Sequence, residues 1–201
     1  MLTQLRPALV LIVLLTLLTG LGYPLAITGI AEVLFPHQAQ GSLVEKDGKV
    51  VGSALIAQAF TSDKYFHPRP SATVAPDPKD ATKTVPAPFN AQNSGASNYG
   101  PSSKAMIDRI KGDADKLKAE NPGTPVPQDL VTTSASGLDP DISPEAADFQ
   151  VPRVAAARGL PADRVSQLVR SAVEAPALGI FGEPRINVLA LNMALDALGR
   201  K

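Results

Sequence analysis

The sequence has 201 residues, and its 19 basic and 19 acidic side chains give a net charge of zero at neutral pH. Because binding to DNA or RNA depends on an excess of Lys and Arg beside the phosphates, this balance argues against a nucleic-acid partner. The chain has no cysteine and 2 histidines, which excludes disulfides and thiolate chemistry and leaves few ligands for a transition metal. The sequence thus predicts no built-in cofactor and no metal site.

An uncharged apolar segment occupies residues 7–31. A helix of roughly 20 apolar residues can cross the hydrocarbon core of a bilayer, so this segment predicts a transmembrane helix. Arg6 precedes it and Glu32 follows it, and positive charge beside a span favours the cytoplasmic side. We therefore expect residues 1–6 to lie in the cytoplasm and residues 32–201 to form an extracytoplasmic domain.

A cleaved signal peptide is the alternative, because it also combines a short basic start with a Leu-rich stretch. The apolar segment continues past the usual length of a signal peptide, and the small-residue pattern for cleavage near Ala26 is poor. Tyr23 suits the interfacial end of a span. The segment is therefore interpreted as an anchor in the lipid bilayer.

The first part of the outer domain predicts a β-hairpin over residues 42–60. Asp47 and Gly48 stand between β-branched residues, and this pair readily adopts the positive φ of a tight turn. The second arm, from Val50 to Phe60, is expected as a strand or as a strand that runs into a short helix. Residues 61–101 are rich in Pro, Ser, Ala, Thr and Asn without a periodic apolar face, so they predict one long loop.

Apolar residues at helical spacing return in residues 101–121, which predict a helix ended by Asn-Pro-Gly. Residues 128–136 contain valine and two threonines and predict a strand. Ser143, followed by Pro and Glu, predicts the start of another helix, because its hydroxyl can cap free amides. We expect Gly159 to end this helix and Pro152 to kink or split it.

Residues 161–174 carry the clearest helical stripe of the chain. Asn187 can cap a last helix, and the alternative there is a strand over residues 185–191. The predicted fold class is α/β, in the sense of α+β: one N-terminal transmembrane helix followed by a single extracytoplasmic domain with a small sheet and several helices. The buried side of the last helix is expected to include Val188, Leu191, Leu195 and Leu198.

Several local patterns imitate functional motifs. Residues 95–102, GASNYGPS, resemble a phosphate-binding loop, but Pro101 stands where that loop needs its lysine. Asp139 and Asp141 begin like a calcium loop, but the spacing fails after the second carboxylate, which favours turn and capping roles. Arginines on two consecutive predicted helices imitate a helix-turn-helix, which the neutral charge and the outward topology disfavour. No catalytic residue is predicted.

Four stretches are informative together: VVGSALIAQAF with YFHPRPSAT, FNAQNSGASNYGPSS, LVTTSASGLDPDISPEAADFQVPRVAAARGL, and FGEPRINVLALNMALD. In this order they resemble one family, the C subunit of the Kdp-type potassium-transporting ATPase. With the N-terminal span, the resemblance covers nearly the whole chain. The chain departs from the family at Ala96, where a second Gly is usual, and at residues 74–85, which look like an insertion.

The resemblance implies a non-catalytic accessory subunit of an ATP-driven, high-affinity potassium uptake pump in the bacterial inner membrane. Its partners would be a channel-like potassium-binding subunit and a P-type ATPase catalytic subunit, which handle K⁺ and ATP for the complex. The chain itself lacks the Asp-Lys-Thr-Gly-Thr phosphorylation motif. The implied role is assembly and stability of the complex, with assistance to ATP binding or ion entry, and Gln150 is the matching candidate for ATP binding.

The turn SGLDPDISPEAA is the candidate contact surface. We expect it to hold the outer domain rigidly against the partner subunits above the ion entrance. The competing hypothesis is a membrane-anchored extracytoplasmic binding module that works alone. The predicted interface residues are Arg69, Asp139, Ser143, Glu145 and Arg185.

Overall fold

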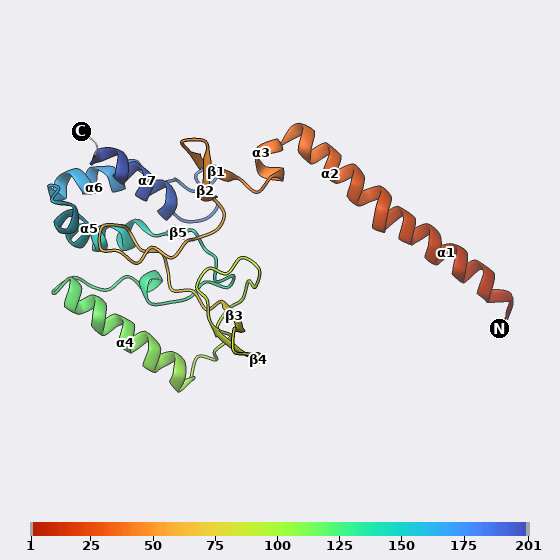
Figure 1. The fold of residues 1–201 in the computed structure, drawn as a ribbon, viewed down its shortest axis with the longest axis horizontal. Coiled ribbons are helices and arrows are strands. Elements are labelled where there is room, and N and C mark those ends of the chain that lie inside the picture. The colour runs from red at the N-terminus through yellow and green to blue at the C-terminus, as the bar shows by residue number, and fades with distance from the viewer. Residues whose placement is uncertain (1, 200–201) are drawn as a thin grey trace. The chain divides into compact units, whose positions relative to one another are not determined.

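The computed structural model describes residues 2–199, which divide into two compact units, one up to residue 53 and the other from residue 54 on. The first unit is dominated by an apolar helix, Leu5–Leu34, which is long enough to cross a membrane and has no buried residue in its apolar window. Figure 1 shows it as one long rod. The sequence prediction of one N-terminal apolar helix is confirmed. The helix consists of α1 (Leu5–Leu17), the π-helical η2 (Leu18–Gly22) and α2 (Tyr23–Leu34), and a 3₁₀ turn, η1 (Leu2–Gln4), precedes it.

A short helix and a hairpin complete the first unit. Helix α3 (Pro36–Ala39) is followed by strands β1 (Leu43–Lys46) and β2 (Lys49–Ser53), which pair antiparallel. Asp47 and Gly48 form the turn with φ of 53° and 72°, so the predicted hairpin is confirmed. The expected extension of the second strand to Phe60 is wrong, because the strand ends at Ser53 and the chain turns.

Between residues 54 and 199, the second unit contains four helices and two pairs of short strands. Each pair of strands is a separate antiparallel sheet, so the mixed helix and strand class is confirmed, with several minimal sheets in place of one small sheet. The helices are α4 (Lys104–Glu120), α5 (Pro144–Arg158), α6 (Ala162–Ser171) and α7 (Val188–Leu198), and a 3₁₀ turn η3 covers Gln128–Leu130. The strands are β3 (Val74–Asp77), β4 (Asp80–Pro86), β5 (Asp141–Ile142) and β6 (Ile186–Asn187).

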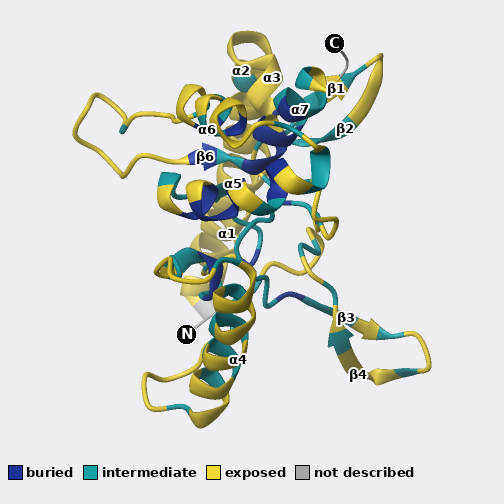
Figure 2. Cartoon of the chain, turned by 90° about the vertical axis from the view of Figure 1, so that its left-hand side faces the viewer, coloured by how far each residue is buried: buried dark blue, intermediate teal, exposed yellow. Residues whose placement is uncertain are grey.

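The hydrophobic core lies where α5, α6 and α7 meet (Figure 2). Phe66, from the loop before β3, is fully buried in it. The predicted apolar stripe of the last helix is confirmed, because Val188, Leu191 and Leu195 are buried and Leu198 packs against the core. Asn187 caps α7 through a hydrogen bond from the backbone N–H of Ala190, at 3.0 Å. The alternative strand is limited to β6.

The prediction of an unstructured loop over residues 61–101 is wrong for residues 74–86, where β3 and β4 form a hairpin. Neither strand has a buried residue, so the hairpin carries no apolar alternation that sequence patterning could detect. Side chains fix its turn instead: Asp77 accepts from the backbone N–H of Lys79 at 2.8 Å, and Asp80 accepts from that of Thr82 at 3.1 Å.

Two further predictions are corrected. Residues 128–136 form no strand, because both the backbone N–H and the hydroxyl of Thr132 bind the carbonyl of Gln128, at 3.0 and 2.9 Å, and curl the chain locally. Helix α5 runs unbroken through Pro152, so it is not split. The carbonyl that Pro152 leaves without a helical donor belongs to Asp148, which is an exposed residue.

Candidate functional site

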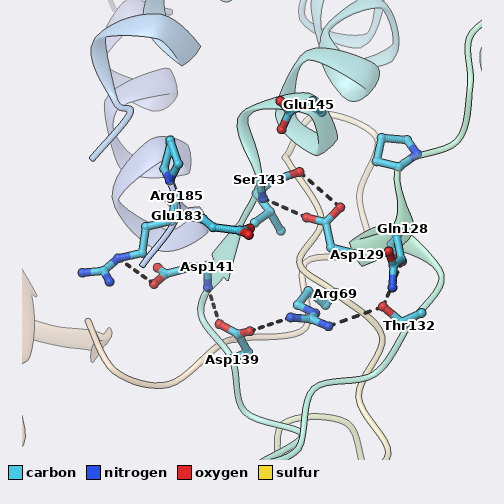
Figure 3. A pocket seen from close by; sticks show the side chains of 13 residues that line it. Arg69, Gln128, Asp129, Thr132, Asp139, Asp141, Ser143, Glu145, Glu183 and Arg185 are labelled. Carbon is cyan, nitrogen blue, oxygen red and sulfur yellow. Dashed lines mark hydrogen bonds and ion pairs between the residues drawn. The ribbon is translucent and has the colours of Figure 1, made fainter. Parts of the chain in front are cut away.

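The five predicted interface residues line one pocket in the second unit, with a volume of 620 Å³. Segments far apart in the sequence build it: the loop before β3, η3, the turn before α5, and the loop before β6 (Figure 3). The contribution of η3 was not predicted from the sequence, because its residues were expected in a strand. The lining residues are Arg69, Pro127, Gln128, Asp129, Thr132, Asp139, Asp141, Ile142, Ser143, Glu145, Glu183, Pro184 and Arg185.

The start of α5 forms one wall of the pocket. Ser143 has extended backbone, and its hydroxyl accepts from the N–H of Ala146 at 3.0 Å, as the predicted cap requires. Asp129 accepts from both the backbone N–H and the hydroxyl of Ser143, at 2.8 and 3.2 Å. A carboxylate at this position also faces the positive end of the helix dipole. The cap is therefore a three-residue arrangement, and Asp129 ties η3 to α5.

An ion pair forms the opposite wall. Arg69 donates to Asp139 at 3.0 Å and to the hydroxyl of Thr132 at 3.4 Å, and Figure 3 shows its guanidinium between these two side chains. The other carboxylate oxygen of Asp139 accepts from the backbone N–H of Asp141 at 3.1 Å. These contacts hold the turn before β5 against the loop that carries Arg69. The pair of aspartates thus has the turn-stabilising role that its sequence spacing favours.

Arg185 completes the rim of the pocket. Its guanidinium lies 3.2 Å from Asp141 and 3.1 Å from Glu174. Burial raises the pKa of Asp141, and the positive charge of Arg185, together with a hydrogen bond from Asn187, opposes this rise. Arg185 therefore helps to keep a half-buried carboxylate ionised.

The pocket is acidic as a whole, because five carboxylates and two guanidiniums line it. Among residues 2–199, Glu145 and Glu183 form no ion pair, so their charges are not compensated within the chain. No group of three or more acidic or histidine side chains in the same range is placed to hold a metal ion. The arrangement suits binding of a cationic side chain at its rim, where charge complementarity adds specificity.

Gln150 lies outside this pocket and is buried. Its side-chain oxygen accepts from the backbone N–H of His67 at 2.8 Å, and its side-chain nitrogen donates to the carbonyl of His67 at 3.1 Å. Asn192 binds Phe66 in the same way, at 2.8 and 3.0 Å. Asn192 was not predicted from the sequence, although a polar residue on the apolar face of a predicted helix is the signal that points to such a role. Both carboxamides hold the segment before Arg69 against the core.

Comparisons with known proteins give a consistent result. Residues 5–197 match the family described as "KdpC: K+-transporting ATPase, c chain". A protein of Bradyrhizobium diazoefficiens named "Potassium-transporting ATPase KdpC subunit" is 70% identical over 201 residues, which is all of both chains. Proteins of the same name from Rhodopseudomonas palustris (69% identical, covering 98% of this chain and 99% of the relative) and Methylobacterium nodulans (68%, covering 100% of both) are also similar. The chain belongs to the KdpC family, the C chains of the K⁺-transporting ATPase.

Proposed function

We propose that this protein is a non-catalytic, membrane-anchored accessory subunit of an ATP-driven potassium uptake pump, and that its acidic pocket binds the partner subunits. The observation that carries the proposal is the convergence of Arg69, Asp139, Ser143, Glu145 and Arg185 on one open pocket. The expected partners are a channel-like potassium-binding subunit and a P-type ATPase catalytic subunit. The expected location is the bacterial inner membrane, with the second unit outside the cell membrane.

The charged residues of the pocket fall into two groups, paired arginines and unpaired glutamates, and this arrangement supports an interface. Arg69 and Arg185 are engaged by carboxylates of the chain itself, so they stiffen the walls. Glu145 and Glu183 are exposed and uncompensated, so they are available to Lys or Arg side chains of a partner. A rigid frame with free charges at its rim loses little conformational freedom on binding, which favours a stable contact.

Assistance to ATP binding is a separate part of the proposal, and Gln150 is its candidate residue. Both ends of the Gln150 carboxamide bind the backbone of His67, and Arg153 donates to its oxygen at 2.7 Å. Direct contact with ATP would require these bonds to break. We therefore favour an indirect role, in which Gln150 maintains the shape of the unit that contacts the partners.

Charge reversal at the rim tests the interface. Glu145→Lys and Glu183→Lys are expected to reduce the recovery of both partner subunits with the tagged full-length chain from mildly solubilised membranes by at least about tenfold. Potassium uptake at low external K⁺ should fall with it. The matched control is Asp163→Lys, because Asp163 is also an exposed acidic residue in the first turn of a helix.

Two results would overturn the proposal. Unchanged partner recovery and uptake in both rim variants would remove the pocket from the interface. Recovery of the unmodified chain alone, as a stable monomer that binds a small ligand, would favour the stand-alone binding module.

A further inference from the structure

A protruding arm, residues 174–185, joins α6 to β6 and carries features that the pocket does not explain. At its base, the backbone N–H of Glu174 donates to the carbonyl of Arg185 at 2.8 Å, and the reverse bond measures 3.1 Å. A second antiparallel bridge joins Ala177 and Phe181. In Figure 2 this segment extends away from the helices as an exposed loop that returns at β6. The arm is thus a short ribbon with a defined conformation.

The tip of the arm is apolar and exposed. Leu178, Ile180 and Phe181 are 88%, 78% and 66% exposed. Large apolar side chains grouped at one exposed site mark interaction surfaces more often than scattered ones do. No part of the described second unit covers these three side chains, so they stay in contact with water.

The backbone at the tip is unfavourable for the residue it carries. Leu178 has a φ of 54° and precedes Gly179 with a φ of 73°, so both central residues of the turn are left-handed. Gly, Asn and Asp adopt this region readily, whereas leucine does not. Residues that break a local backbone rule cluster at functional sites, and Leu178 breaks such a rule while it stays exposed.

We propose that the tip of the arm inserts into an apolar socket on a partner subunit of the ATPase, and that Lys or Arg side chains border this socket. The base of the arm carries Glu174 and Glu183, and Glu183 and Arg185 also line the acidic pocket. The arm and the pocket therefore form one continuous surface with an apolar end and an acidic end. This inference rests on the proposed function, because it assumes that the same surface faces the partners.

The charge of the surface favours a protein over the bilayer. Membrane-binding tips usually combine apolar residues with Lys, Arg or Trp, because bacterial lipid surfaces are anionic. The arm has no Lys or Trp, and its Arg185 is paired with Asp141 and Glu174. Its acidic base adjoins a pocket in which carboxylates outnumber guanidiniums. An anionic surface would repel this end of the unit.

Photo-cross-linking in membranes that contain the co-expressed partner subunits tests the inference. Phe181 is replaced by p-benzoylphenylalanine in the full-length chain, with the same replacement at Glu145 to report on the pocket and at Ile107, exposed on α4, as a control. We expect the Phe181 probe to cross-link to a partner subunit at an apolar segment flanked by Lys or Arg. The Ile107 probe should give at least about tenfold less of that product.

A second variant separates the side chain from the conformation of the turn. Leu178→Asn suits the left-handed backbone, so the arm should keep its shape while it loses the most exposed of its three apolar side chains. We expect at least about tenfold lower recovery of partner subunits than for Ile107→Asn.

The outcomes distinguish the two proposals. The proposed docking of the arm would be overturned, and the pocket interface left in place, by cross-linking of the Glu145 probe to a partner without cross-linking of the Phe181 probe. A Phe181 product with lipid or with a second copy of this chain would have the same meaning. Unchanged recovery of partner subunits with the Leu178→Asn chain would also overturn the docking of the arm. If neither probe reached a partner subunit in chains that still reach the membrane, both proposals would fail.

Discussion

At the scale of single residues, two buried carboxamides determine the path of the loop that supplies Arg69. Gln150 binds the backbone N–H and carbonyl of His67, and Asn192 binds those of Phe66, as a neighbouring strand would. Arg153 adds bonds to the carbonyls of Asp63 and Tyr65 at 2.9 and 3.0 Å. An extended segment without a strand partner thus has its polar groups satisfied by side chains, which buried backbone requires.

Replacing Gln150 by leucine tests this role. Gln150→Leu leaves the N–H and carbonyl of His67 without these partners, and an unsatisfied buried group costs about 1–3 kcal/mol. We expect the free energy of unfolding of the full-length chain in detergent, measured by urea denaturation, to fall by about that amount. Gln167→Leu on the exposed face of α6 is the control and should change it by less than about 0.5 kcal/mol.

Gln150→Leu also tests whether Gln150 contacts ATP directly. A chain that keeps its stability as Gln150→Leu, while the assembled complex binds ATP more weakly, would contradict the structural role and support a direct one.

A second prediction at this scale concerns pH. Burial raises the pKa of Asp141 above its ordinary value of 3.8, so the folded chain binds this proton more tightly than the unfolded chain. As the pH rises from the ordinary pKa through the raised pKa of the folded chain, Asp141 ionises and the free energy of unfolding falls. Arg185→Ala removes the guanidinium that opposes the rise, so the pKa of Asp141 should move further up.

At a pH above the pKa of Asp141 in the folded chain, we expect Arg185→Ala to be less stable than the parent by roughly 0.5–1 kcal/mol. The effect is small because the ion pair between Arg185 and Asp141 is partly exposed. The difference should vanish as the pH falls below 3.8 and Asp141 is protonated in both states. Arg185→Lys should retain most of the stability. A stability difference that is independent of pH would contradict the assignment, and a carboxyl ¹³C titration of Asp141 measures the pKa directly.

At the scale of elements, α4, α5 and α7 each begin at a residue whose side chain caps the helix. Ser143 caps α5 at 3.0 Å and is reinforced by Asp129, whereas Ser103 caps α4 through a longer bond of 3.4 Å, and no carboxylate of residues 2–199 reinforces it. Ser143→Ala should lower the free energy of unfolding by about 1–2 kcal/mol, and Ser103→Ala by about 0.5 kcal/mol. Equal losses for the two variants, measured by the same denaturation, would show that Asp129 adds nothing to the cap.

Elements with an apolar period, a cap or a turn pair such as Asp47-Gly48 could be predicted from the sequence, and elements without any of these signals could not. Helices α5 and α7 carry Ser143 and Asn187 at their starts and bury regular stripes. The β3–β4 hairpin buries no residue, so its sequence has no such period.

The pocket was predictable only in part, for a related reason. Its turn before α5 has local signals, whereas Asp129 enters the site through a contact across 14 residues that no local pattern encodes. Arg69 and Arg185 were expected from a family resemblance, and the ion pairs that place them depend on the folded chain.

At the scale of the whole molecule, an apolar helix that spans the membrane would determine by its orientation which compartment contains the pocket. The apolar helix has 30 residues, which at 1.5 Å per residue gives about 45 Å against a hydrocarbon core of about 30 Å. Arg6 lies at its start and Glu32 near its end. The positive-inside rule therefore favours a cytoplasmic N-terminus and an extracytoplasmic second unit. This orientation would also separate Gln150 from cytoplasmic ATP.

Because the chain has no cysteine, single introduced cysteines report the orientation without background. Lys118→Cys on α4 should react with a membrane-impermeant maleimide in intact spheroplasts, and Thr3→Cys only after permeabilisation. Leu15→Cys, within the span, should react in neither condition. The reverse pattern would place the second unit in the cytoplasm and reopen direct ATP contact. Loss of the Thr3→Cys label in every condition, with a shortened chain by mass spectrometry, would mean that the apolar helix is a cleaved signal peptide and that the subunit stays on the membrane through its partners alone.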